Sequence, residues 1–157
     1  MAKMSDYANH SPQDVRRMIR EGKWDRPTSG MCAGHVQANL VVLPRDLAYD
    51  FLVFAQRNPK PCPILDVTEP GDTEPRLVAP GANIATDIPR YRVWKDGECV
   101  DQPTDVRRYW RDDLVAFLLG CSFSFEGALL QSHIGIRHIE CDCNNYQIGR
   151  ASCRERV

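Results

Sequence analysis

The sequence predicts a mixed α/β fold with short buried strands, one β-hairpin and a central helix–elbow–helix. Short apolar runs at 40–43 and 62–68 have the composition of buried strands and alternate with segments of helical periodicity. The pair Asp96-Gly97, typical of a two-residue hairpin turn, lies within the segment 90–100. This alternation, with one hairpin, indicates a mixed α/β protein. A chain of 157 residues allows one domain, or two small ones that share a core.

The N-terminal third predicts two helices around one strand. Ser11 is expected to cap a helix that starts at Pro12 and ends at Gly22, with Asp14 reaching back as in a capping box. Residues 40–43 form a short apolar run that predicts a buried strand. The segment 44–57 predicts the next helix, which an Asn-Pro-Lys-Pro sequence stops.

The middle of the chain predicts a strand, a loop and the hairpin. Residues 62–68 form the second strand, and 69–89 are rich in Pro, Gly and Ala, as in an ordered surface loop. Residues 90–100 form the hairpin, and Thr104-Asp105 is expected to cap a short helix after it. Residues 134–139 are a final strand candidate.

The segment 112–130 is predicted to be two short helices joined at an elbow. The run 114–119 is apolar almost all round, which favours a buried core helix, and Gly120 is placed to end it in the left-handed conformation. Ser122 or Ser124 can cap the second helix through its hydroxyl. This run is too short to span a membrane.

The elbow concentrates reactive groups, and we interpret it as a candidate active site. Cys121 and Glu126 are the catalytic candidates, and Ser122 and Ser124 with the helix start could hold a substrate carboxylate. The alternative is purely structural, with both serines as caps, Cys121 as a buried apolar residue and Glu126 facing water.

Three residues outside the elbow are further candidates for substrate binding. Gln37 and Asn39 lie just before the first strand, where amide side chains could orient a substrate, although both could instead bond to local backbone. Arg90 could anchor a carboxylate, although a solvated charge on the hairpin explains this residue better when it is taken alone.

Composition narrows the function classes. The net charge of −1 gives no indication of nucleic-acid binding, and the polar start without an apolar leader predicts a cytoplasmic protein rather than a membrane protein. Seven cysteines at irregular spacing do not predict a disulfide framework. The absence of CxxC and HExxH predicts no metal site, and no cofactor is expected.

The last residues differ from the rest of the chain. Residues 148–157, IGRASCRERV, are interpreted as a translated sequencing adapter, because ATC GGA AGA GCG TCG TGT AGG GAA AGA GTG encodes them in order. We interpret 141–157 as a divergent tail and 11–140 as the N-terminal part of one domain.

Five motifs in order carry a family resemblance. They are Gly34 with Gln37-Ala38-Asn39-Leu40, then RNPKPCP at 57–63, VTEPGD at 67–72, DIPRYR at 87–92 and GCSFSFE at 120–126. Over roughly 11–140 the chain resembles the "putative hydro-lyase" family, also described as D-glutamate cyclase-like or as domain of unknown function 1445. The family chain continues well past this point, so we expect the fold here to be incomplete.

The resemblance implies a lyase that removes water from a small carboxylic acid, or a cyclase that converts D-glutamate to 5-oxo-D-proline. Both reactions need a carboxylate anchor and a proton-transfer group. The elbow could supply both, with Glu126 as general acid or base and Cys121 as acid or nucleophile. The alternatives are a module that binds a small acid without chemistry, and an inactive fragment. Assembly as a homo-oligomer is left open.

Overall fold

The computed structural model describes residues 7–28, 30–121, 124 and 126–136. Over these residues the elements run in the order α1 (Pro12–Arg20), β1 (Ala38–Pro44), α2 (Arg45–Arg57), β2 (Ile64–Val67), β3 (Val93–Lys95), β4 (Glu98–Asp101), the 3-10 helix η2 (Arg107–Tyr109), β5 (Leu114–Gly120) and α3 (Glu126–Gln131). The predicted mixed α/β class is confirmed. Ser122, residues 137–139 of the last strand candidate and the tail 141–157 lie outside the described residues.

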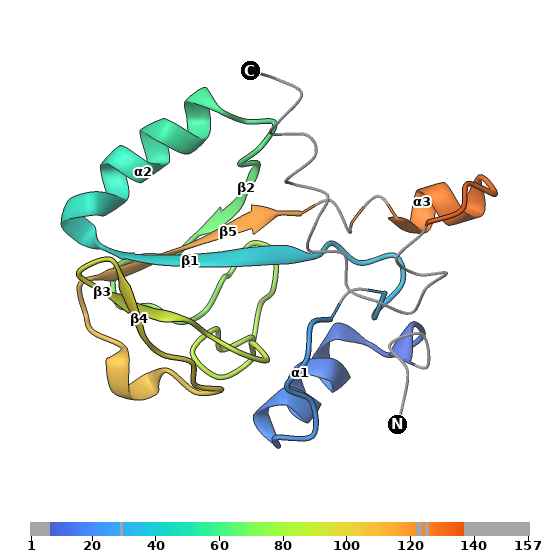
Figure 1. Cartoon of the computed structure of the whole chain (residues 1–157), viewed down its shortest axis with the longest axis horizontal. Helices are drawn as coiled ribbons and strands as arrows, with labels where there is room; N and C mark the ends of the chain where they lie inside the picture. The colour runs from blue at the N-terminus through green and yellow to red at the C-terminus, as the bar shows by residue number, and fades with distance from the viewer. Residues whose placement is uncertain (1–6, 29, 122–123, 125, 137–157) are drawn as a thin grey trace.

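A three-stranded antiparallel sheet forms the centre of the fold. Its strand order is β1-β5-β2, so β5, the last strand within the described residues, lies between two strands that precede it in the sequence. β1 pairs with β5 from Ala38 opposite Gly120 to Pro44 opposite Leu114. β2 also runs antiparallel to β5, with an irregularity between Ile64 and Asp66. β1 and β2 therefore run in the same direction, and α2 connects them over one face (Figure 1).

The predicted core helix at 114–119 is wrong, because these residues form the central strand β5. All six side chains are buried. Val115, Phe117 and Leu119 pack with Ala48 and neighbouring residues of α2 on one face, and Leu114, Ala116 and Leu118 alternate with them along the strand. A strand covered on both faces has no polar alternation, so its sequence looks like a buried helix.

Gly120 ends β5 rather than a helix. It lies outside the left-handed region, in contrast to the prediction, and its N–H donates to the carbonyl of Pro63 across 2.8 Å. A Cβ at Gly120 would come within 3.3 Å of the Pro63 ring. The glycine thus serves close packing against the segment that leads into β2.

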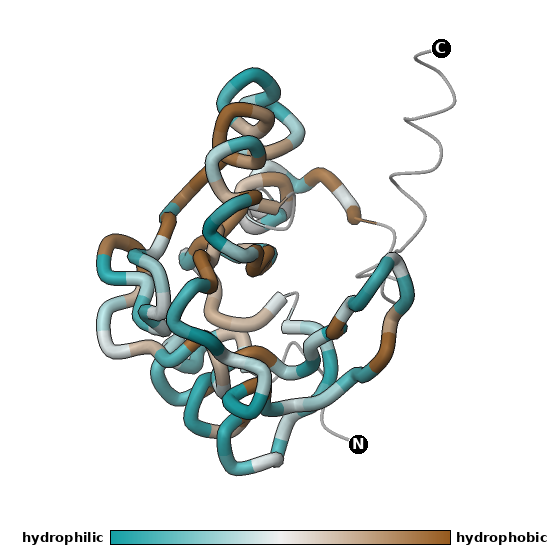
Figure 2. The backbone as a smooth tube through the Cα atoms, turned by 90° about the vertical axis from the view of Figure 1, so that its left-hand side faces the viewer, coloured by the Kyte–Doolittle hydropathy of each residue, from teal (hydrophilic) through white to brown (hydrophobic). Residues whose placement is uncertain are grey.

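The helix signals of the N-terminal third are confirmed. The Ser11 hydroxyl accepts from the Asp14 N–H at 3.2 Å and donates to the Asp14 carboxylate at 2.6 Å. Gly22, with φ of 68°, follows the helix end in the left-handed conformation that glycine favours. α2 buries Ala48 and Ala55, and Figure 2 shows its turns alternating between hydrophobic and hydrophilic colour at the top of the view.

The hairpin is also confirmed. β3 and β4 pair in antiparallel fashion, and Asp96 and Gly97 both have positive φ, 51° and 84°, as a type I′ turn requires. The hairpin and the loops before it lie on the side of the sheet opposite α2 (Figure 1). There Ala85, Tyr91 and Val106 form a cluster with Leu40 of β1. Residues 134–136 form no strand.

Candidate functional site

The elbow lies at the end of the sheet where β1 begins and β5 ends, with α3 just beyond it (Figure 1). Because Ala38 pairs with Gly120, the residues on either side of this pair, Gln37 and Cys121, meet. The Cys121 N–H donates to the carbonyl of Gln37 across 3.3 Å. The sheet register therefore brings together two predicted site residues that are far apart in the sequence.

The Ser124 hydroxyl closes this junction. It accepts from the Gln37 N–H at 3.1 Å and donates to the Gln37 carbonyl at 3.4 Å, while the Ser124 N–H donates to the Cys121 carbonyl. Ser124 is predicted to cap the second helix or to help hold a substrate carboxylate, and the second role stays a prediction. Its hydroxyl instead satisfies the peptide groups of Gln37, and α3 begins two residues later at Glu126. Gln37, Cys121 and Ser124 form what we call the elbow junction.

The two amide candidates differ in their surroundings. The Gln37 side chain accepts from the Thr28 hydroxyl at 3.0 Å and donates to the Met31 carbonyl at 3.2 Å. It therefore fastens the loop after α1 to the elbow junction. Asn39 is exposed on β1 opposite Leu119, and its side chain makes no hydrogen bond within the described part of the chain.

The catalytic candidates are both accessible. Cys121 is a half-buried free thiol, and Glu126 is half-buried as the first residue of α3. Ser122, Phe123 and Phe125, the elbow residues next to Ser124, lie outside the described residues. The catalytic assignments of Cys121 and Glu126 stay predictions.

Arg90 makes its described ion pair with Asp25 and not with a residue of the elbow. Its guanidinium contacts the Asp25 carboxylate at 3.1 Å, and both side chains are more than half exposed. Asp25 follows α1, so this pair links the hairpin side of the fold to the α1 region. An exposed pair of this kind contributes little to stability. The role of Arg90 as a carboxylate anchor stays a prediction.

Asp87 lies in a group of polar side chains that the sequence does not mark as a site. The carboxylate is buried and accepts from the Asn83 N–H and the Thr86 hydroxyl. It also forms ion pairs with Arg16 and Arg20 of α1, at 3.8 Å and 3.3 Å. The only sequence signal was the motif DIPRYR at 87–92, which carried the family resemblance without a role for Asp87.

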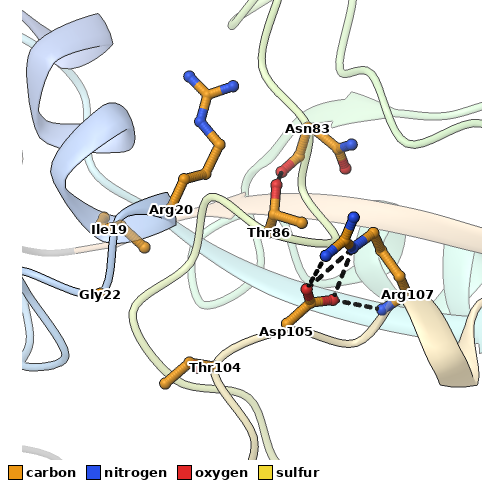
Figure 3. A pocket seen from close by; sticks show the side chains of 8 residues that line it. All are labelled: Ile19, Arg20, Gly22, Asn83, Thr86, Thr104, Asp105 and Arg107. Carbon is orange, nitrogen blue, oxygen red and sulfur yellow. Dashed lines mark hydrogen bonds and ion pairs between the residues drawn. The ribbon is translucent and has the colours of Figure 1, made fainter.

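A cavity of about 510 Å³ opens beside this cluster (Figure 3). A second hollow of about 620 Å³ shares Thr104, Asp105 and Arg107 with it. Neither is lined by a predicted site residue. Hydrogen bonds from Arg107 lower the pKa of Asp105, so this wall of the cavity stays ionised.

No group of three or more His, Cys, Asp or Glu side chains among the described residues could hold a metal ion. No helix within them is long and apolar enough to cross a membrane.

Comparison with known proteins shows which proteins the chain is similar to. A family model described as D-glutamate cyclase matches residues 115–154, which include Cys121, Ser124 and Glu126. A "Putative hydro-lyase" of Psychrobacter arcticus is 58% identical over 141 residues, which are 90% of this chain and 54% of that protein. The chain belongs to the "Putative hydro-lyase" family. Relatives from other bacteria give the same result.

A "Putative hydro-lyase" of Clostridium beijerinckii is 58% identical over 139 residues, which are 88% of this chain and 53% of that protein. "Putative hydro-lyase YcsI" of Bacillus subtilis is 57% identical over 130 residues, which are 83% of this chain and 51% of that protein. The chain thus spans about half the length of these family members. The family-model match also extends into the segment 148–157, whose interpretation as a translated adapter stays a prediction.

Proposed function

We propose that the whole protein is a hydro-lyase that removes water from a small carboxylic acid, with the elbow junction as part of its active site. The observation that supports this proposal is a set of hydrogen bonds that joins Cys121 and Ser124 to the peptide groups of Gln37, the residue that precedes β1. Ser124 lies two residues before Glu126, the first residue of α3. The family-model match over the same residues supports the assignment.

The reaction needs one group that takes a proton and one that gives a proton. In a dehydration, a base removes the proton from the carbon beside the carboxylate, the hydroxyl leaves as water after protonation, and a carbon–carbon double bond forms. In a cyclisation of D-glutamate, the amine attacks the side-chain carboxyl carbon and one of its oxygens leaves as water. Glu126 is our general base or acid, and Cys121 our acid or nucleophile.

Orientation of the substrate falls to the polar groups around the junction. The exposed amide of Asn39, without a described partner, is free to bind a substrate oxygen. Gln37 contributes by shaping the junction, because its own amide already holds Thr28 and Met31. Ser122 would bind the substrate carboxylate together with Asn39. Ser124 would join them only by giving up the donation of its hydroxyl to the Gln37 carbonyl, and Arg90 only by leaving Asp25.

A module that binds a small acid without chemistry is the rival function. About half of each relative has no counterpart in this chain, and that half could contain further catalytic groups. The described segment could then bind a small acid without carrying out the reaction. The expected cytoplasmic location and a homo-oligomeric assembly remain predictions.

Turnover by a full-length family member that contains this segment tests the proposal. D-glutamate and a panel of small hydroxy acids are assayed for loss of water, with Glu126→Gln and Cys121→Ser as variants. Glu126→Gln keeps the shape and removes the proton transfer, so we expect turnover to fall roughly 10²-fold or more with little change in melting temperature. The matched control is Glu69→Gln, an exposed carboxylate remote from the elbow motif.

The three outcomes separate the alternatives. A selective loss in Glu126→Gln or Cys121→Ser supports catalysis at the elbow. Near-normal turnover in both variants would make the elbow a scaffold and move the catalytic groups elsewhere in the protein. Ligand-induced stabilisation without any product would favour the binding module.

A further inference from the structure

The region around α1 forms a small lobe of its own. Its core consists of Val15, Ile19, Trp24, Met31 and Cys32, with Tyr7 packed against them, all from residues 7–32. The sheet and the hairpin side have separate clusters. We call the boundary between this N-terminal lobe and the rest of the fold the seam.

Polar contacts cross the seam. The buried Asp87 binds Arg16 and Arg20 of α1, Arg90 binds Asp25, and Gln37 binds Thr28. Boundaries between structural units are preferred places for small-molecule sites, because both sides can supply groups to one ligand.

The 510 Å³ cavity lies in this seam (Figure 3). Arg20 and Gly22 line it from the lobe, and Thr86, Thr104 and Arg107 line it from the other side. Its volume falls in the range of small-molecule sites. The cavity is therefore bounded by both sides of the seam and has the size of a metabolite site.

The walls of the cavity favour an anion. Its charged lining residues are Arg20, Arg107 and Asp105, two positive and one negative, and the adjoining hollow adds Arg108. Arg20 contacts Asp87 through Nε, and Arg107 contacts Asp105 through Nε and Nη2. A guanidinium has five N–H donors in a planar fork that suits carboxylate and phosphate groups. Both arginines can thus keep their aspartate partners and still bind a ligand.

Asp87 is the residue that holds this arrangement in place. Three residues of the cavity wall, Arg20, Asn83 and Thr86, each contact its buried carboxylate. The backbone between the lining residues Asp105 and Arg107 is fixed separately, because the Val106 N–H donates to the Ala85 carbonyl at 3.0 Å. Side chains and backbone on both sides of the cavity are therefore anchored before any ligand arrives, which lowers the cost of binding.

We propose that the seam cavity is a binding site for a small organic anion, whose carboxylate or phosphate group lies between Arg20 and Arg107. Asp87 is the positioning residue, and Thr86 and Thr104 provide neighbouring hydroxyl groups. The site is distinct from the elbow junction and does not depend on the proposed catalytic function.

An NMR titration of the 15N-labelled chain tests the site at constant ionic strength. The probes are sodium succinate, inorganic phosphate and succinamide, which has the shape of succinate without its charge. We expect succinate or phosphate to shift the amide signals of Gly22, Thr86 and Arg107 in a saturable manner, and succinamide to leave them in place. Competition between succinate and phosphate shows which of the two groups the site prefers.

Two arginine variants test which side chains donate hydrogen bonds to the bound anion. Arg107→Gln changes an exposed side chain, and Arg20→Gln leaves Asp87 with Arg16, so both variants should fold. Loss of one charged donor is expected to weaken binding about tenfold or more. The matched control is Arg17→Gln on the same helix, whose side chain pairs with Asp14 and lies outside the cavity lining. Binding within twofold of the parent is expected there.

Several results would overturn the proposal. These are equal shifts with succinamide, shifts that never saturate, or unchanged affinity in both Arg20→Gln and Arg107→Gln. Shifts confined to Cys121 and Ser124 would also contradict the seam site, while agreeing with the proposed function of the elbow. Conversely, normal turnover in Glu126→Gln would contradict catalysis at the elbow but would not contradict a seam site that this titration had shown.

Discussion

The N–H of Gln37 donates to the hydroxyl of Ser124 across 3.1 Å, although 87 positions separate the two residues in the sequence. This bond connects the approach to the first strand with the segment that follows the last strand. The same hydroxyl donates back to the Gln37 carbonyl at 3.4 Å. The elbow is thereby fixed to β1 and not only to the strand that precedes it.

Ser124→Ala should destabilise the fold by about 1 kcal/mol, because the peptide N–H of Gln37 loses a partly buried acceptor. Chemical denaturation of the parent and the variant measures the change. The matched control is Ser132→Ala, at an exposed position, where a change within about 0.5 kcal/mol is expected. Equal effects at the two serines would mean that the elbow junction is not a stabilising contact.

Gly71→Ala should destabilise the fold more than a glycine-to-alanine change at a loop position where a Cβ has open space. Gly71 has φ of +80°, and a Cβ there would come within 3.0 Å of the Asp112 Cα. Its N–H donates to Leu114 and its carbonyl accepts from the Trp110 indole, so the backbone cannot move away without breaking these bonds.

Gly81→Ala is the control for Gly71→Ala. Gly81 has nearly the same φ, +76°, but a Cβ there meets no atom within 4 Å. The left-handed conformation alone should cost about 1–2 kcal/mol at Gly81, and denaturation should show a larger loss at Gly71. Similar losses would show that the backbone of Asp112 moves aside at little cost.

Alkaline pH should weaken the fold through Tyr91. Burial raises the pKa of this phenol, whose hydroxyl donates to the Ile84 carbonyl at 2.7 Å. The Tyr91 hydroxyl therefore holds its proton more tightly in the folded state than in the unfolded state, where the pKa of tyrosine is about 10. The stabilisation is complete below pH 10 and is lost as the pH rises above it, by up to about 1.4 kcal/mol per pH unit.

Tyr91→Phe should flatten this dependence between pH 9 and 11, while lowering stability at pH 8 because the Ile84 carbonyl loses its donor. Tyr49→Phe is the control, since Tyr49 is 72% exposed and should leave the slope unchanged. Urea denaturation at a series of pH values measures both slopes. Parallel pH profiles for the parent and Tyr91→Phe would exclude this residue as the cause.

Local signals in the sequence were sufficient for the ends of α1 and for the hairpin turn, but not for Gly120, which ends a strand, nor for the short helix η2, whose N-cap is Val106 and not Thr104 or Asp105. The Ser11 cap, Gly22 after α1 and the Asp96-Gly97 turn all appear as predicted, because each depends on bonds or dihedral angles within a few residues. The family motifs likewise needed only their order along the chain, and the relatives confirm the family.

Contacts between distant segments decided the rest. The run 114–119 is a strand because α2 covers one of its faces and the hairpin side the other, and burial on both faces removes the alternation that distinguishes a strand from a helix. The pairing of Gln37 with Ser124, and the joining of Asp87 to Arg16 and Arg20, likewise bring together residues from separate segments. Hydrogen bonds and ion pairs act over a few ångströms, so only the folded chain determines which polar groups meet.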